Sequence, residues 1–351
     1  MKKNDYYSLD ILKIIAALIV VSMHTEPLYY CKKEPVLELY DVLARCAVPI
    51  FFMLTGFFLS DKQHVEYGSQ KLGMSIGIKS DDVDRQIKKI IRLYILWTAI
   101  YFPVTFIHGR RDGMPFTRFV LGFIKQLLFV GENYNSWHLW FLLVEVYALI
   151  ILRILIRRLN NRVIITGIAL TLWMFGNMFT DLCFRIDLLP PLLKTVMLFL
   201  RILFTDNGRL FTAFLYIWVG ANLKDIILVF DKFLNKSVVM GIGIIGGFIR
   251  LIGNDIELIA AFGTLILSCS ILILALFTNK YMPGKGYPIY LYLRKISMIV
   301  YFIHMYVWMI WYIILYQEKT YGIISFIATA TTSFAIAFIK VSIDYNIKSK
   351  N

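Results

Sequence analysis

Charged residues are scarce in this sequence. Asp, Glu, Lys and Arg together make up only 17% of the 351 residues, whereas a soluble domain carries about a quarter. Hydrophobic residues reach 59%, and the mean hydropathy is +0.68. So few charges cannot cover the surface of a water-soluble globule, and the composition excludes that class. It indicates an all-α, polytopic bundle of transmembrane helices.

Cysteine is also rare. The four cysteines, Cys31, Cys46, Cys183 and Cys269, are far apart and form no CxxC pair. This spacing indicates neither a zinc site nor a redox pair, and we expect no metal. The sequence leaves open whether Cys31 and Cys183, which both fall in predicted outer loops, form a disulfide.

Long apolar runs dominate the chain instead. Windows of about 19 residues predict about ten membrane spans, at residues 9–29, 42–60, 90–108, 138–155, 163–180, 210–223, 238–251, 258–277, 297–316 and 322–341. Two more segments, 117–131 and 192–205, are amphipathic and predict re-entrant or interfacial helices. We find no repeat and no second soluble domain, so we expect one integral-membrane domain over residues 1–351. Any soluble catalytic domain would then be another polypeptide.

The basic residues indicate the topology. With the N-terminus inside, 22 of the 37 Lys and Arg residues fall in inner segments and 12 in outer loops. This bias predicts that both termini are cytoplasmic and that the chain is a multi-pass protein of the cell membrane. The net charge of +14 therefore indicates loops beside membrane lipids and no nucleic-acid partner.

The first span carries three ionisable side chains on one face. At about 100° per residue, Asp10, Lys13 and His24 form one stripe along a helix. A charge inside hydrocarbon costs at least about 2.5 kcal/mol, so the stripe should face protein or a water-filled cavity. We interpret it as the wall of a site. In the alternative, Asp10 pairs with a snorkelling Lys13 at the cytoplasmic edge, while His24 hydrogen-bonds to a neighbouring helix.

Cations also lie at the ends of two other spans. Arg45 opens the second span at a predicted depth near His24, and Pro49 inside that span frees a backbone carbonyl, as in a helix that lines a cavity. Lys89 and Arg92 share a face at the cytoplasmic end of the third span, where they could hold the phosphates of an anionic donor. The alternatives are a snorkelling Arg45 and ordinary headgroup anchors at Lys89 and Arg92.

The fourth and ninth spans add buried polar groups. His138 and Glu145 lie seven residues apart on one helix face, and a carboxylate near mid-membrane needs a partner, which we expect to be a His or Arg of this same set. Tyr301 and His304 share a face of the ninth span. A purely structural, buried histidine is the alternative interpretation of His304.

These segments together resemble acyltransferase family 3, a family of integral membrane acyltransferases. LDILKIIA at 9–16 with His24 is similar to the family's L-D-x-L-R-x-I-A to H, and VPIFFMLTG at 48–56 to its V-P-x-F-F-x-x-S-G. KIIR at 89–92 resembles R-x-x-R, HLWFL at 138–142 is identical to H-L-W-F-L, and SMIVYFIH at 297–304 matches S-x-x-x-Y-x-x-H. The shared order makes the resemblance fairly specific.

The resemblance implies roles for several residues. His24 takes the place of the family's essential histidine, and Lys13 replaces the usual arginine of the first span. Lys89 with Arg92 replaces an arginine pair associated with the donor. Lys13, RCAVPIFFM at 45–53 and DNGRLF at 206–211 also resemble the membrane half of VanT-type serine racemases, which is thought to import L-serine.

Our leading hypothesis is an enzyme that moves an acyl group from cytoplasmic acetyl-CoA, or another acyl-CoA, to a hydroxyl of an extracytoplasmic cell-envelope glycan or lipid-linked saccharide. His24 would act as general base, and Arg45 or His138 would stabilise the oxyanion. Lys89 and Arg92 would hold donor phosphates, and Glu145 or Asp10 would orient a cationic partner.

Two other hypotheses stay open. The first is an importer of a small amino acid, without catalysis, in which Lys13 or Arg45 binds the carboxylate and Glu145 or Asp10 the ammonium group. The second is a structural partner of a cell-envelope assembly. The sequence also leaves open whether the chain forms a homodimer.

Overall fold

A computed structural model of the chain describes residues 6–67, 77–205, 208–253, 256–282, 289–314 and 321–350. Within these ranges the side chains of 62–67, 280, 291 and 346–350 are not described.

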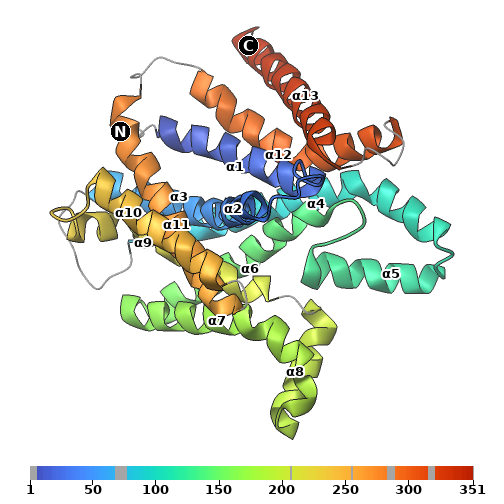
Figure 1. Ribbon diagram of the computed structural model, residues 1–351, viewed down its shortest axis with the longest axis horizontal. Helices are drawn as coiled ribbons and strands as arrows, with labels where there is room; N and C mark the ends of the chain where they lie inside the picture. The colour runs from blue at the N-terminus through green and yellow to red at the C-terminus, as the bar shows by residue number, and fades with distance from the viewer. Residues whose placement is uncertain are drawn as a thin grey trace. The chain divides into compact units, whose positions relative to one another are not determined.

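The regular structure of the described residues is entirely helical (Figure 1). Thirteen α-helices occur in these ranges: α1 (Tyr7–Thr25), α2 (Glu34–Ala44), α3 (Ala47–Tyr67), α4 (Ser80–Arg111), α5 (Phe116–Lys125), α6 (Trp140–Arg158), α7 (Arg162–Phe184), α8 (Pro191–Phe204), α9 (Arg209–Val229), α10 (Lys236–Ile252), α11 (Glu257–Thr278), α12 (Ile289–Ile314) and α13 (Ile323–Lys350). Short helical turns also occur, including the π-helical η1 (Gln126–Val130) and the 3₁₀ turns η2 (Trp137–Leu139) and η5 (Asn279–Tyr281). The predicted all-α bundle is confirmed.

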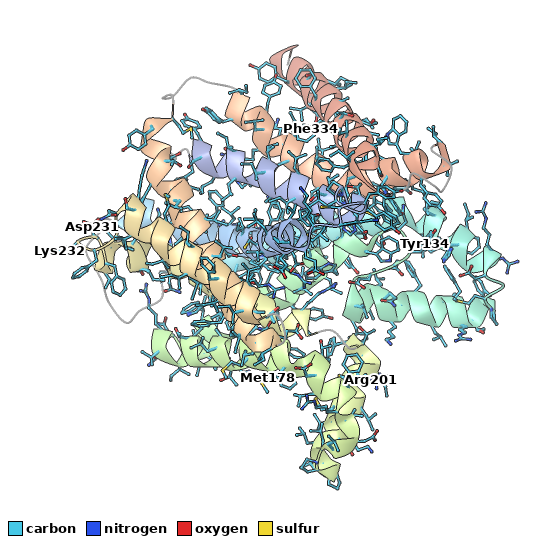
Figure 2. The ribbon with its side chains drawn as sticks, in the orientation of Figure 1. Tyr134, Met178, Arg201, Asp231, Lys232 and Phe334 are labelled. Carbon is cyan, nitrogen blue, oxygen red and sulfur yellow. The ribbon has the colours of Figure 1, made fainter. Side chains whose placement is uncertain are left out.

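Most predicted spans coincide with long helices. Nine helical runs among the described residues are long and apolar enough to cross a membrane. The seventh predicted span corresponds to α10, which has 17 residues. The amphipathic segments form α5 with η1, and α8. Apolar side chains lie exposed on the helices (Figure 2), such as Met178 on α7 and Phe199 on α8, as lipid-facing surfaces require.

The chain divides into two compact units. The terminal unit comprises Met1–Phe51, Asp231–Asn254 and Phe262–Asn351, and the central unit comprises Phe52–Phe230 and Asp255–Ala261. Each is described by itself below. The prediction of one domain stays a prediction.

In the terminal unit, α1 and α13 both pack against α12. A shared core of small and branched side chains joins them, including Val21 of α1, Val300 of α12 and Ala337 of α13. The backbone N–H of Gly322 donates to the carbonyls of Thr25 and Glu26, both at 3.0 Å. This residue has φ +104°, a conformation that favours glycine, and it ties the start of α13 to the end of α1.

In the central unit, α3 and α9 cross at backbone contact. A Cβ on Gly220 would lie 2.0 Å from the carbonyl oxygen of Met53, and one on Gly56 would lie 1.9 Å from that of Ile217. Small residues let helices approach this closely where no hydrophobic effect drives their association. In the same unit, α9 packs against α6 and α7, and α6 packs against α4.

Candidate functional site

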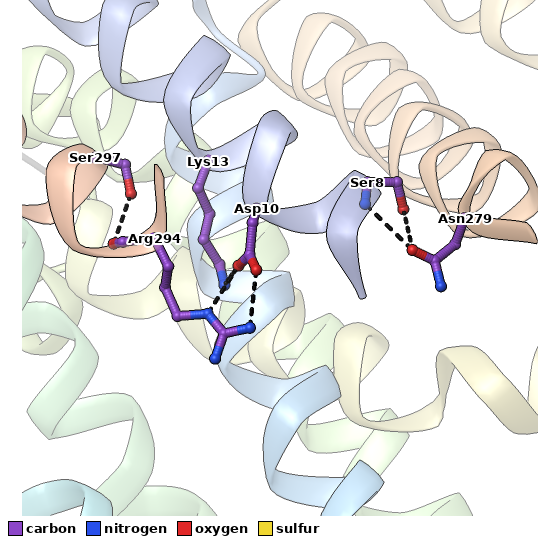
Figure 3. Close-up of polar contacts among 6 residues, drawn as sticks. All are labelled: Ser8, Asp10, Lys13, Asn279, Arg294 and Ser297. Carbon is purple, nitrogen blue, oxygen red and sulfur yellow. Dashed lines mark hydrogen bonds and ion pairs between the residues drawn. The ribbon is translucent and has the colours of Figure 1, made fainter. Parts of the chain in front are cut away.

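The buried carboxylate of Asp10 organises the polar end of α1 (Figure 3). The guanidinium of Arg294 in α12 donates to both carboxylate oxygens, through Nε at 2.9 Å and through Nη2 at 2.8 Å. Lys13 Nζ adds a third contact at 3.1 Å. Asp10 is 1% exposed, whereas Lys13 and Arg294 are 17% and 34% exposed. Two partly accessible cations therefore share one buried anion.

The backbone beside this cluster is also held. The N–H and hydroxyl of Ser8 both donate to Asn279 Oδ1 at 3.2 Å, and the Ser297 hydroxyl donates to the carbonyl of Arg294 (Figure 3). These contacts fix the first turn of α1 against η5 and hold a turn of α12.

The alternative interpretation of Asp10 and Lys13 as a local pair is thus correct for that contact, but it is incomplete. Arg294 is the stronger partner because a bidentate guanidinium–carboxylate pair has better geometry than a single ammonium contact. The sequence did not single out Arg294 as a site residue. A buried carboxylate that needs a partner was the signal, but the sequence did not specify the partner helix.

Two histidines meet further along the same helix pair. The ring centres of His24 in α1 and His304 in α12 are 5.3 Å apart. His304 is fully buried, and its Nδ1 lies 2.7 Å from the carbonyl oxygen of Tyr301. A carbonyl can only accept, so Nδ1 carries a proton and Nε2 of the neutral ring is an acceptor. The structure therefore brings together His24, Tyr301 and His304.

Arg45 lies at the C-terminal cap of α2 and not inside a helix. Its side chain is exposed and pairs with Asp41 at 3.0 Å. Asp41 also pairs, at 2.8 Å, with the buried Arg250 of α10. This ion-pair network favours a surface role for Arg45 over a catalytic one.

The prediction that Pro49 frees a backbone carbonyl within a continuous span was wrong in its local geometry. The apolar run breaks earlier, between α2 and α3, and Pro49 is the third residue of α3. The first turn of a helix needs no amide hydrogen at this position, so proline there costs no intrahelical hydrogen bond.

In the central unit, Glu145 of α6 lies buried at 4% exposure. The hydroxyl of Thr55 in α3 donates to its Oε1 at 2.7 Å, and Gln86 of α4 also hydrogen-bonds to it. Lys89, one turn after Gln86, interacts with Glu145 electrostatically. The need of Glu145 for a partner is met from two helices, by Thr55, Gln86 and Lys89 and not by the expected His or Arg. Thr55 and Gln86 were not predicted, because neither is charged.

Lys89 and Arg92 are both exposed along α4. Their positions are accessible to an anion, although Glu145 offsets part of the charge of Lys89.

His138 lies in η2, just before α6, and is buried. Its ring centre is 5.4 Å from that of Tyr101 in α4, in an edge-on arrangement. The α4 helix therefore contributes to both clusters, since Gln86 and Lys89 act on Glu145 and Tyr101 contacts His138. Sequence spacing related His138 to Glu145 but gave no indication of Tyr101.

The described part of the chain contains no candidate metal site. No group of three His, Cys, Asp or Glu side chains there could hold a metal ion. The four cysteines, all within the described ranges, form no disulfide.

Comparison with known proteins adds a family. The family model described as "Acyltransferase domain", that of acyltransferase family 3, matches residues 6–341. No solved structure matches the chain.

Three curated relatives are racemases. Two amino-acid racemases of Enterococcus faecalis are 26% and 27% identical to this chain, over 64% and 45% of it, and over 29% and 20% of their own lengths. A serine/alanine racemase of Enterococcus gallinarum is 28% identical over 38% of this chain and 17% of its own length. The chain thus spans less than a third of the length of each relative.

Proposed function

The chain belongs to acyltransferase family 3 and is an acyltransferase, and from that premise we propose that its donor is a cytoplasmic acyl-CoA, with acetyl-CoA as the first candidate. The acceptor we propose is a hydroxyl group of an extracytoplasmic cell-envelope glycan or lipid-linked saccharide. Both termini would lie in the cytoplasm, and the chain would cross the cell membrane several times.

The observation that carries this proposal is the contact between His24 and His304 on helices that Asp10 and Arg294 join. In the proposed step, His24 removes the proton of the acceptor hydroxyl, and the hydroxyl oxygen attacks the thioester carbonyl carbon. The carbon–sulfur bond breaks, and the thiolate leaves and takes up a proton. A neighbouring imidazole suits this step because it can share the proton that His24 accepts.

Cations in each unit support an anionic donor. In the terminal unit, Lys13 and Arg294 are partly accessible cations beside the buried Asp10. In the central unit, Lys89 and Arg92 are exposed on one face of α4, and Glu145 would orient Lys89. Phosphate groups are bound by such cations through charge-assisted hydrogen bonds. His138, which is buried, is the better supported of the two proposed oxyanion groups, since Arg45 pairs with Asp41.

The test is acetyl-CoA hydrolysis and acetyl transfer by purified protein in nanodiscs. His24→Ala should lower the rate about 100-fold or more, as expected for loss of a general base. His108→Ala is the matched control, because His108 is partly exposed and pairs with Asp112 outside the proposed machinery. Equal rates in the wild type and His24→Ala would contradict the assignment of His24.

A second candidate function is import of a small amino acid, favoured by the racemase names of the curated relatives. Uptake of L-serine into proteoliposomes, with no consumption of acetyl-CoA, would replace the enzymatic proposal.

A further inference from the structure

The central unit contains a hollow that none of the proposed catalytic residues lines. Its wall includes Phe129 of η1, Glu132, Trp140 of α6, Phe204 of α8 and Arg209 of α9. Its empty volume, open mouth included, is about 280 Å³. Ligand pockets typically combine apolar and aromatic walls with a few polar groups that fix orientation, and this hollow has that composition.

The polar groups of the hollow neutralise one another. The Arg209 guanidinium forms an ion pair with Glu132 and lies 4.6 Å from the ring centre of Trp140. Both charged side chains are partly exposed, at 46% and 31%. The hollow therefore carries no net charge, which disfavours a free phosphate or carboxylate. It offers N–H donors and carboxylate oxygens beside an aromatic ring.

The backbone around the hollow is held in an unusual shape. The segment Gln126–Val130 is a π-helix, a form often found at functional sites. Tyr94 donates to the carbonyl of Leu127 at 2.8 Å, and Tyr147 donates to that of Leu128. Gly131 follows with φ +79°, and a Cβ there would lie 2.6 Å from Trp140 Cα. Two tyrosines thus brace the backbone that leads to Glu132.

The opposite wall is fixed by a helix crossing. A Cβ on Gly208 would lie 1.8 Å from the carbonyl oxygen of Gly176 in α7. Only glycine permits this approach, which sets the start of α9 and hence the position of Arg209. Arg209 belongs to the DNGRLF segment that the sequence singled out and that the proposed reaction does not use.

We propose that this hollow is the subsite that binds the acceptor saccharide. An aromatic ring can pack against the C–H face of a sugar, while the guanidinium and carboxylate exchange hydrogen bonds with its hydroxyls. The ion pair of Glu132 with Arg209 would stay intact when the saccharide binds, so neither charge would lose its partner. Trp140 lies two residues after His138, so the subsite adjoins a proposed oxyanion group along the chain. This inference rests on the proposed function.

The test is direct binding of two probes, methyl glucoside and the β-1,4-linked disaccharide of N-acetylglucosamine, to the full chain in nanodiscs. Calorimetry would give the dissociation constants. We expect at least one probe to bind the wild type, and Glu132→Gln and Arg209→Gln each to weaken it about tenfold, equivalent to about 1.4 kcal/mol. Trp140→Phe keeps a ring in place and should weaken binding less, which guards against a simple folding defect.

The matched control is the exposed ion pair of Asp187 with Lys194, at 2.7 Å in the same unit. Asp187→Asn should leave saccharide binding unchanged. The inference is overturned if neither probe binds, if the hollow variants bind as the wild type does, or if L-serine binds and Glu132→Gln abolishes that binding. Wild-type hydrolysis of acetyl-CoA, measured separately, reports on the proposed function alone.

Discussion

At the scale of single residues, the strongest polar feature is the clamp of Asp10 by Arg294. A carboxylate that is almost fully buried must be compensated, because an unpaired charge in the membrane interior is expensive. The clamp joins two helices that are distant in sequence through two hydrogen bonds, whereas Lys13 adds one salt bridge to Asp10 from within the first helix. Arg294 therefore bears more of the local stability than Lys13.

We predict that Arg294→Gln lowers the thermal unfolding midpoint in nanodiscs by about 4 °C or more, equivalent to about 2 kcal/mol for a hydrogen-bonded charge. Lys295→Gln is the control, since this neighbouring side chain is exposed. The double variant Asp10→Asn with Arg294→Gln should recover part of the loss, because no buried charge is left uncompensated. Equal midpoints for the two single variants would contradict this role.

At the scale of elements, the central unit depends on the contact between α3 and α9. No larger residue fits at the two glycines of this crossing, because the nearest atoms belong to the backbone and cannot rotate away. A side chain there would push the helices apart over their whole contact.

We predict that Gly220→Ala destabilises the protein by about 1–3 kcal/mol, the usual cost of overpacking. Gly167→Ala in α7 is the matched control, because a Cβ there meets nothing within 4 Å, and alanine favours a helix over glycine by up to about 1 kcal/mol. Thermal unfolding of both variants measures the difference. A midpoint of Gly220→Ala at or above that of Gly167→Ala would show that the crossing is not tightly packed.

The sequence predicted the long helices well, but it predicted the breaks between them and their boundaries poorly. Hydropathy located the apolar runs because long helices bury or expose apolar side chains along their whole length. Hydropathy did not reveal the break between α2 and α3, because Arg45 and Cys46 do not lower the mean hydropathy of the window enough to end the apolar run. The α4 helix begins ten residues before the predicted span because its first turns are polar, and hydropathy detects only the apolar part.

The candidate site was predicted in part for the same reason. His24 and His304 were recognisable as polar residues inside apolar runs, and the family motifs gave them an order. Their mutual contact required the packing of α1 on α12, which no local pattern encodes. Thr55, Gln86 and Tyr101 carry no charge and lie on helices whose relative rotation is set by packing, so sequence alone gave them no special place.

At the scale of the whole molecule, the two units share one family match over residues 6–341. For the orientation in the membrane, the positive-inside bias predicts that Cys31 lies outside and that the segment before α4 lies inside. Cysteine chemistry can test this orientation because Cys46 and Cys183 are buried and Cys269, which is partly buried, lies within the apolar helix α11.

We predict that an impermeant maleimide labels Cys31 in intact cells that express the chain, and that Cys31→Ser removes this labelling. In the Cys31→Ser background, Lys79→Cys should react only after the membrane is opened, since position 79 is exposed and predicted to be cytoplasmic. Labelling of Lys79→Cys in intact cells would reverse the predicted topology.

The clamp at Asp10 also has a consequence for the order of events during synthesis. Arg294 lies 284 residues after Asp10, a stretch that takes roughly 15 to 60 seconds to synthesise at the usual rates. Throughout that time α1 must hold its carboxylate without the guanidinium. Lys13, only three residues away, can pair with it as soon as the first turns of the helix form. Lys13 thus acts as an early counter-ion that allows α1 to stay inserted in the membrane. Arg294 completes the pairing once α12 has been synthesised and inserted.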